Sequence, residues 1–182
     1  MLRLRGIVHP APFGIIGTGP RVDVVFSIHP ADAQAYLEKG QAPPAVQGSL
    51  LIDTGAESTL VDDGIPTNLG LTPIRFQPIM FGDGRPQDRP VYRMSIMIAM
   101  EDDAGRPHKG SWVGDVVGMD AAKQGHGGLM GRDFLRHFRF QYDGRAGTFE
   151  LASDGDRDPA IKAARAQERH EKKKRRGNRR HK

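Results

Sequence analysis

The sequence contains no cysteine among its 182 residues. This absence excludes disulfide scaffolds, thiolate zinc sites, thiol nucleophiles and iron–sulfur clusters. Long apolar runs are also missing, since no stretch reaches the roughly 18 consecutive apolar residues that span a bilayer. Residues 1–17 are interrupted by arginine, histidine and proline, and they lack the unbroken apolar core of a secretory signal. We therefore expect a cytoplasmic location and no transmembrane segment.

Glycine and proline are abundant, with 23 and 13 residues. Such a composition argues against a helical bundle and favours short strands joined by tight turns. A content of 37% hydrophobic and 27% charged residues is typical of a globular protein, and the length suits one domain with a tail. We expect an N-terminal arm or edge strand at 1–20, a folded domain at 21–156 and a basic, disordered tail at 157–182.

The positive charge is concentrated in the tail. Residues 157–182 carry 12 Lys and Arg against three acidic residues, a local net charge of +9, which leaves 15 basic and 19 acidic residues for the rest. Three interpretations stay open for the tail: a solvated extension, a non-specific contact to nucleic acid or an anionic surface, and a source of self-processing sites. The tail contains no aromatic residue, so base stacking is not expected.

The pattern of apolar residues predicts a mostly β domain with one or two short helices. Strands are expected at 21–28, 46–52, 59–61, 74–81, 91–100, 111–117, 139–142 and 147–151. Residues 30–39 suit a short helix or a wide loop, residues 62–70 a series of turns, and residues 133–138 a short helix with Asp133 near its exposed amides.

The most informative triplet is Asp53-Thr54-Gly55, which directly follows the apolar run 50–52. Such a run suggests a strand end that is buried on both faces. The threonine can hydrogen-bond the loop, and the glycine lets backbone amides approach the carboxylate closely. On the triplet alone, an ordinary turn is the alternative. The context favours an acid that is held rigidly in a tight loop.

A second apolar pair runs into a glycine about 75 residues later, in residues 129–135 (LMGRDFL). Together with residues 51–61 (LIDTGAESTLV), it resembles the retropepsin-like, or retroviral-type, aspartic proteases. The resemblance spans roughly residues 46–151 and implies an all-β acid-protease barrel with one lobe per chain. It also implies an aspartic endopeptidase that needs no metal or organic cofactor and acts on polypeptides.

The chemistry of that family needs two adjacent carboxylates that share one proton, because like charges at that distance cannot both ionise cheaply. This sequence contains a single Asp-Thr-Gly. The catalytic Asp53 must then meet Asp53 of a second copy, so the resemblance implies a homodimer. It further implies that Thr54 links the two loops and that Gly55 offers its carbonyl to substrate, with Ala56 completing the active-site loop.

The resemblance also assigns residues that brace this loop. Leu129, Met130 and Gly131 are expected to pack beneath it, and Glu57 is expected to form an ion pair with Arg132. Two independent surface charges are the alternative for that pair. We expect Asp62 and Asp63 to be solvated turn residues.

The candidate flap, a hairpin that would close over substrate, has its tip at Phe81, Gly82, Asp83 and Gly84. Retroviral flaps have an apolar tip, whereas Arg85 follows this one and Asp83 lies within it. The charged tip selects basic or polar substrates, or else the hairpin is an ordinary solvent-exposed turn.

Other kinds of site find little support. The seven histidines show no HExxH or other metal spacing, so no metal site is expected. A non-enzymatic alternative remains: a retropepsin-fold dimerisation or peptide-binding module whose basic tail contacts nucleic acid.

Overall fold

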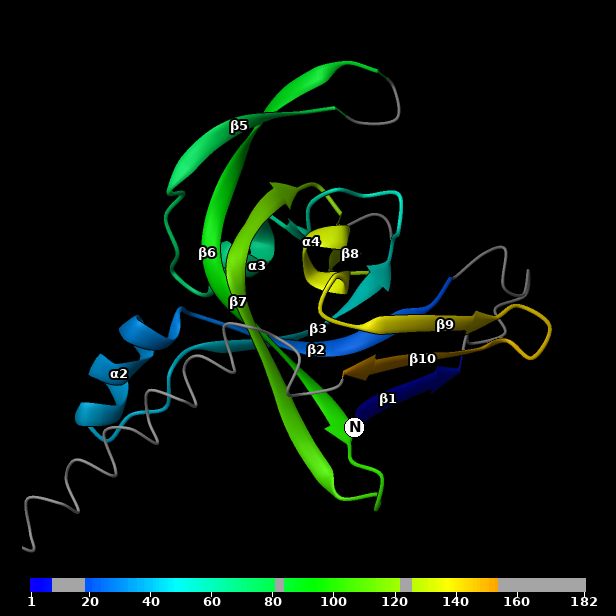
Figure 1. Ribbon diagram of the computed structural model, residues 1–182. Helices are drawn as coiled ribbons and strands as arrows, with labels where there is room; N and C mark the ends of the chain where they lie inside the picture. The colour runs from blue at the N-terminus through cyan, green and yellow to red at the C-terminus, as the bar shows by residue number, and fades with distance from the viewer. Residues whose placement is uncertain (8–18, 81–83, 122–125, 154–182) are drawn as a thin grey trace, which may run out of the picture.

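The computed structural model describes residues 1–7, 19–80, 84–121 and 126–153, and these residues are mostly β (Figure 1). The strands are β1 (Leu2–Ile7), β2 (Arg21–Ser27), β3 (Ala45–Ile52), β4 (Leu60–Asp62), β5 (Arg75–Met80), β6 (Pro86–Glu101), β7 (Pro107–Met119), β8 (Gly128–Met130), β9 (Arg139–Asp143) and β10 (Thr148–Ser153). The helices are α2 (Pro30–Glu38), α3 (Gly64–Asn68) and α4 (Arg132–Leu135). The expected all-β class is confirmed.

Six strands close into a barrel in the order β2-β3-β8-β4-β7-β6, and β6 returns to pair with β2. Most neighbours are antiparallel, but β3 with β8 and β4 with β7 run parallel. The short β8 therefore lies between β3 and β4, with residues 129 and 130 opposite residues 51 and 52. This insertion brings the two sequence motifs together.

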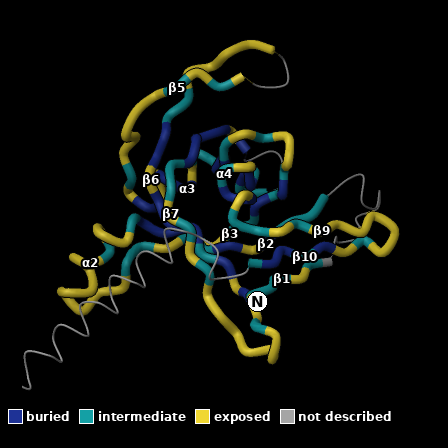
Figure 2. Tube along the Cα trace, viewed as in Figure 1, coloured by how far each residue is buried: buried dark blue, intermediate teal, exposed yellow. Residues whose placement is uncertain are grey.

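The barrel is filled by one main apolar core. Strand β2 alternates, so that Val22, Val24 and Phe26 point inward, and Phe26 is fully buried. Met94 and Ile96 of β6 and Phe134 of α4 complete the centre, each with no exposed area. Figure 2 shows the buried residues along the barrel strands, whereas α2 is mostly exposed and has no buried residue. The core thus supports β3 and α4, which carry the two motifs.

Strands β6 and β7 are longer than the sequence pattern predicts. They pair continuously from Val91 opposite Val117 to Glu101 opposite Pro107. The Asp102 carboxylate holds the connecting turn by accepting bonds from the amides of Ala104 and Arg106. The hydrogen bond from the Arg106 amide is the main reason why the pKa of Asp102 lies well below its ordinary value. The first residues of both strands are mostly solvent-exposed, so they lack the alternation that marks a strand in sequence.

Three further strands continue the sheet beyond the barrel, in the order β1–β10–β9. Residues 2–7 of the expected arm form β1, which pairs antiparallel with β10. Residues 8–18 and the tail from 154 onward, including the expected disordered segment, lie outside the described residues. A further difference is α3, which occupies part of the segment expected to contain only turns; it buries Ile65 and Pro66. Within the described ranges, no helix has the length and apolar character needed to span a membrane.

Candidate active site

Asp53 lies at the point where β3 leaves the barrel. Its own amide donates to the carbonyl of Met130 at 3.1 Å, which extends the parallel pairing of β3 with β8 by one residue. Ile52 and Met130 beneath it are buried. The Asp53 carboxylate therefore lies at the boundary of the apolar core, and the pairing with β8 holds its backbone in place.

The loop after Asp53 turns its amides onto the carboxylate. The Gly55 amide donates to Asp53 Oδ1 at 2.8 Å, and the Ala56 amide donates to the same oxygen at 3.3 Å. A Cβ on Gly55 would lie 3.1 Å from Oδ1, so glycine permits this close approach. Both bonds use Oδ1, and Oδ2 has no partner among the described residues. One oxygen positions the half-buried acid while the other stays available for chemistry.

Four consecutive carbonyl groups of the loop are bound by the start of α4. The Arg132 guanidinium donates from Nη1 to the carbonyls of Thr54 at 3.0 Å and Gly55 at 2.9 Å. The Arg132 amide donates to the carbonyl of Ala56, and the Asp133 amide donates to the carbonyl of Glu57. The first turn of the helix thus satisfies its free amides with the site loop.

The prediction of an ion pair between Glu57 and Arg132 is wrong. The two side chains form no ion pair in the described part of the chain, and both are exposed. The physical reason is that the Thr54 and Gly55 carbonyls lie within reach of the guanidinium and together accept its hydrogen bonds. Arg132 does contact the site loop, but through backbone oxygens rather than through Glu57. The Gly55 carbonyl retains a second lone pair, because a carbonyl oxygen can accept two bonds.

A part-buried pair that sequence analysis missed connects the residue before β4 to α4. Thr59 donates from Oγ1 to Asp133 Oδ1 at 2.7 Å and from its amide to Asp133 Oδ2 at 3.0 Å. The Gly131 amide donates to Thr59 Oγ1 at 3.2 Å. Asp133 was expected near the exposed amides of its helix, and its Oδ1 does accept a hydrogen bond from the Phe134 amide. Its other two hydrogen bonds come from Thr59, just before β4, and these connect the two motifs. No local sequence signal marks this pair, because its members are 74 residues apart.

The Thr59→Val variant is expected to lower the free energy of unfolding by about 2–4 kcal/mol. Valine keeps the volume but removes the charge-assisted bond to Asp133 and leaves the buried Gly131 amide without its acceptor. Denaturant unfolding of the purified chain measures the loss. The exposed Thr67, whose Oγ1 donates only to the carbonyl of Asp63, is the matched control, and Thr67→Val should cost less than about 1 kcal/mol. Equal losses in the two variants would contradict the bracing role.

The candidate flap corresponds to the β5–β6 hairpin, which extends from the barrel on the side of the site loop (Figure 1). Its tip residues Phe81, Gly82 and Asp83 lie outside the described residues, and Gly84 follows with a positive φ of 73°. Ile79 of β5 and Ala56 of the site loop pack on one small apolar cluster. That cluster contains Leu60, Val91, Val117, Met119 and Ala121. The part of β5 next to the hairpin tip and the site loop thus pack on the same cluster.

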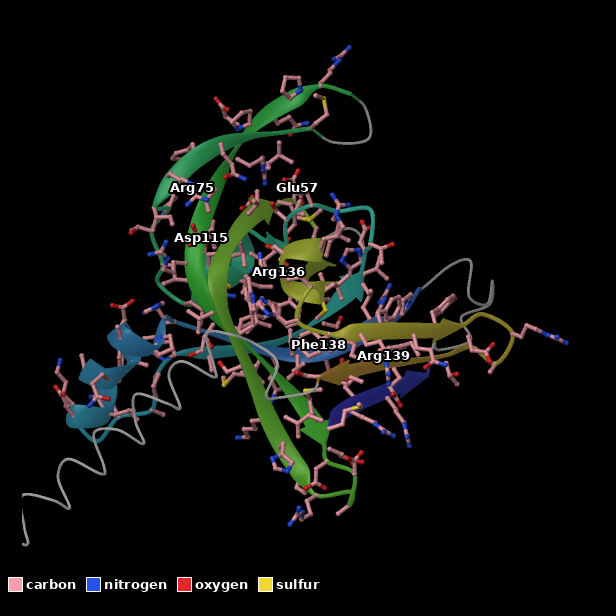
Figure 3. All side chains as sticks on the ribbon, in the orientation of Figure 1. Glu57, Arg75, Asp115, Arg136, Phe138 and Arg139 are labelled. Carbon is pink, nitrogen blue, oxygen red and sulfur yellow. The ribbon has the colours of Figure 1, made fainter. Side chains whose placement is uncertain are left out.

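Ion pairs fix the base of the hairpin. Asp115 of β7 accepts from Arg75 of β5 at 2.5 Å and from Arg93 of β6 at 2.8 Å, and Figure 3 shows Arg75 and Asp115 side by side. The hydrogen bond from Arg93 is the main cause that holds the pKa of Asp115 below its ordinary value. This triad ties three strands together on an exposed face, so we assign it a structural role.

Asp62 and Asp63, expected to be solvated turn residues, are both bonded. Asp62 accepts from the amides of Gly64 and Ala121, and Asp63 pairs with Arg89 at 2.6 Å. The expectation of plain solvation is therefore wrong, because the turn folds back onto β6 and the segment after β7. Neither carboxylate contacts the Asp53 loop through any of these bonds.

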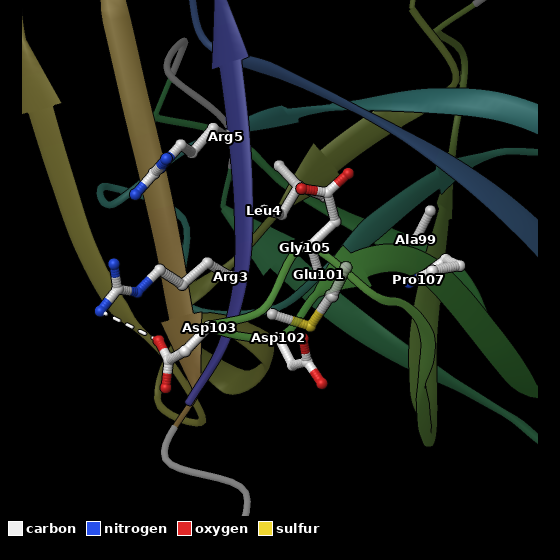
Figure 4. A pocket seen from close by; sticks show the side chains of 10 residues that line it. Arg3, Leu4, Arg5, Ala99, Glu101, Asp102, Asp103, Gly105 and Pro107 are labelled. Carbon is white, nitrogen blue, oxygen red and sulfur yellow. Dashed lines mark ion pairs between the residues drawn. The ribbon is translucent and has the colours of Figure 1, made fainter.

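A cavity of about 350 Å³ lies elsewhere, between β1 and the turn that joins β6 to β7 (Figure 4). Its wall includes Arg3, which pairs with Asp103 at 3.3 Å, and the turn acid Asp102. These charges hold the turn against β1. Among the described residues, no group of three or more His, Asp or Glu side chains is arranged to bind a metal ion.

Comparison with known proteins finds a likeness among solved structures. No protein-family model matches the chain, and no curated protein matches it. Among solved structures, the chain is similar to the crystal structure of a retropepsin-like aspartic protease from Rickettsia conorii, at 14% sequence identity and a TM-score of 0.38. The match covers 82% of this chain and 91% of that one. That protein is of the family that residues 51–61 and 129–135 resemble.

Proposed function

We propose that the chain is a retropepsin-like aspartic endopeptidase whose catalytic dyad consists of Asp53 from two copies. The observation that carries the proposal is the Asp53 loop itself. Two backbone amides hold Oδ1, and Arg132 with the Thr59–Asp133 pair braces the loop from behind. A carboxylate held this rigidly at the end of a core strand, with its second oxygen unpartnered among the described residues, suits proton transfer at a fixed point.

A single chain supplies one such carboxylate, whereas the reaction requires two. In the proposed dimer the charged Asp53 takes a proton from a water molecule held between the two carboxyl groups, and that water attacks the peptide carbonyl. The protonated Asp53 of the other copy polarises the carbonyl oxygen and then protonates the leaving nitrogen. The pair carries one proton because two like charges in contact cannot both ionise cheaply.

The neighbouring residues have roles in substrate binding and assembly. Thr54 is exposed and would link the two loops across the dimer axis. The Gly55 carbonyl, which already accepts one bond from Arg132, would use its second lone pair for an extended substrate. The exposed Phe76 and Met80 of β5 add apolar surface to the flap hairpin. The cytoplasmic location expected from the sequence stays a prediction.

The proposal is tested by incubating the full chain with a denatured protein mixture between about pH 4 and pH 7, a window set by ordinary carboxyl chemistry. Fragments identified by mass spectrometry are the expected result. The rate should pass through a maximum in pH, because both the fully charged and the fully protonated pair are inactive. Absence of cleavage at chain concentrations where the protein is dimeric would favour the non-enzymatic module instead.

A further inference from the structure

The site loop carries negative charge that has no counter-charge bound to it. Residues 53–59 contain two acidic residues, Asp53 and Glu57, and no basic residue. Oδ2 of Asp53 has no partner among the described residues, and the exposed Glu57 side chain forms no hydrogen bond or ion pair with any of them. Figure 3 shows Glu57 on the side of the loop that faces the β5–β6 hairpin. In the proposed dimer, two such loops bring four carboxylates together.

The arginines around this loop are bound to other groups. Arg132 donates to two backbone carbonyls of the loop rather than to Glu57. Arg89 of β6 pairs with Asp63 at 2.6 Å, on the far side of β4 from the loop, and its Nε donates to a carbonyl of β7. A cation that arrives from outside these contacts therefore meets carboxylates that are free to bind it.

The sequence of the chain contains such a cation. Five basic residues follow one another at 172–176 (KKKRR), within a tail of net charge +9, whereas the remainder of the chain has 15 basic and 19 acidic residues. We call this segment the basic run. Residues 154–171 connect it to the end of β10 and can span about 60 Å when extended. A domain of roughly 150 residues has a radius of gyration of only about 15 Å, so the basic run can reach the site loop.

The surface beside the carboxylates distinguishes an occupant from a substrate. Ala56 of the loop and Ile79 of β5 pack on the apolar cluster that contains Leu60. The basic run has no apolar residue, and the one large apolar side chain of the tail, Ile161, lies outside it. The basic run therefore matches the charge of the loop but leaves the apolar surface uncovered. This match suits a segment that occupies the site without being positioned for cleavage.

We propose that the basic run 172–176 binds the carboxylates of the site loop and thereby inhibits the chain's own active site. The inhibition rests on the proposed function, whereas the contact can be measured without it. Occupancy of the loop excludes substrate. A cation beside the Asp53 pair also favours the state in which both carboxylates are charged, and that state lacks the proton that the reaction needs. Because the contact is electrostatic, salt weakens it.

Neutralising the basic run in the full chain tests the inhibition. The variant changes all five residues to glutamine (K172Q, K173Q, K174Q, R175Q and R176Q). Its kcat/KM for an uncharged peptide should exceed that of the wild type at least about fivefold at about 20 mM salt, since several exposed ion pairs are lost together. At about 0.5 M salt, where the screening length is about 4 Å, the difference should fall below about twofold.

The Glu57→Gln substitution tests where the basic run binds. In this background, the same five changes should raise kcat/KM at least about threefold less than they do in the wild-type background, because the run has lost one of its carboxylates. Glu101→Gln is the matched control. Glu101 ends β6, is likewise exposed and forms no ion pair within the described ranges. In the Glu101→Gln background the full rise should remain.

A binding measurement is independent of activity. A fluorescein-labelled peptide of residues 157–182 should bind the neutralised chain at low salt, detected by fluorescence anisotropy. Glu57→Gln should raise the dissociation constant at least about threefold, and Glu101→Gln should leave it unchanged. The same peptide with its basic run changed to glutamine should bind at least about fivefold more weakly.

The outcomes separate this contact from the proposed function. An unchanged kcat/KM in the neutralised variant would overturn the inhibition even if the chain cleaves peptides. Equal effects of Glu57→Gln and Glu101→Gln would place the contact elsewhere and overturn it. Cleavage of the wild-type chain within residues 157–182, detected by mass spectrometry, would make the tail a substrate instead of an inhibitor. Binding that depends on Glu57 in a chain that cleaves nothing would support the contact and refute the protease.

Discussion

The Asp53→Asn variant is expected to hydrolyse peptide bonds at least about 10³-fold more slowly than the wild-type chain, measured as kcat/KM. Asparagine cannot take a proton from water, so neither copy can supply the base. Its side-chain oxygen can still accept from the amides of Gly55 and Ala56, which bond the corresponding Asp53 oxygen at 2.8 and 3.3 Å. The loop should therefore keep its shape, and the thermal midpoint should stay near that of the wild type.

Two controls make this result specific. Asp23→Asn removes an exposed carboxylate from β2 and should leave kcat/KM unchanged. Mixing wild type with an equal amount of Asp53→Asn should leave only about a quarter of the dimers with two intact acids, if copies assort at random. Activity per wild-type chain should then fall by about half, because a mixed dimer lacks one carboxylate. Activity that survives in the variant would assign the cleavage to another site or to a contaminant.

The fold was predictable where side-chain alternation and turn residues agree. Val22, Val24 and Phe26 alternate in β2, and the Asp143-Gly144 turn separates β9 from β10 as expected. The first residues of β6 and β7 were not predictable, because residues that are exposed on both faces leave no period-two signal. The closure of β6 onto β2 is likewise a long-range pairing that no local pattern encodes.

The candidate site, like the fold, was predictable from the sequence only in part. The family resemblance implied that residues 129–131 would pack beneath the Asp53 loop, and residues 129 and 130 of β8 do pair with the end of β3. The partner of Arg132 was wrong because a guanidinium can bond either a carboxylate or backbone carbonyls, and sequence does not reveal where carbonyls point. The Thr59–Asp133 pair was missed because its members are 74 residues apart.

The Gly131→Ala variant is expected to lower the free energy of unfolding by more than about 3 kcal/mol. A Cβ at this position would lie 2.4 Å from the carbonyl carbon and oxygen of Ser58 and 2.8 Å from the amide nitrogen of Thr59. These atoms belong to the backbone, so no rotamer change relieves the contact. Either β4 or the start of α4 must move, and the bond from the Gly131 amide to Thr59 Oγ1 then stretches.

The backbone conformation of Gly131 does not contribute to this loss of stability, so the variant tests the steric contact of the new Cβ alone. Gly131 has φ −83° and ψ 178°, an extended conformation that alanine adopts readily. Gly40→Ala is the converse control: its φ is 68° with no atom near the new Cβ, so it should cost only about 1 kcal/mol of strain. Gly144→Ala, with ordinary φ and its nearest neighbour at 3.6 Å, should stay within about 0.5 kcal/mol of wild type. If denaturant unfolding ranks Gly131→Ala with Gly144→Ala, then β4 and α4 are not in the close contact on which the bracing of the Asp53 loop depends.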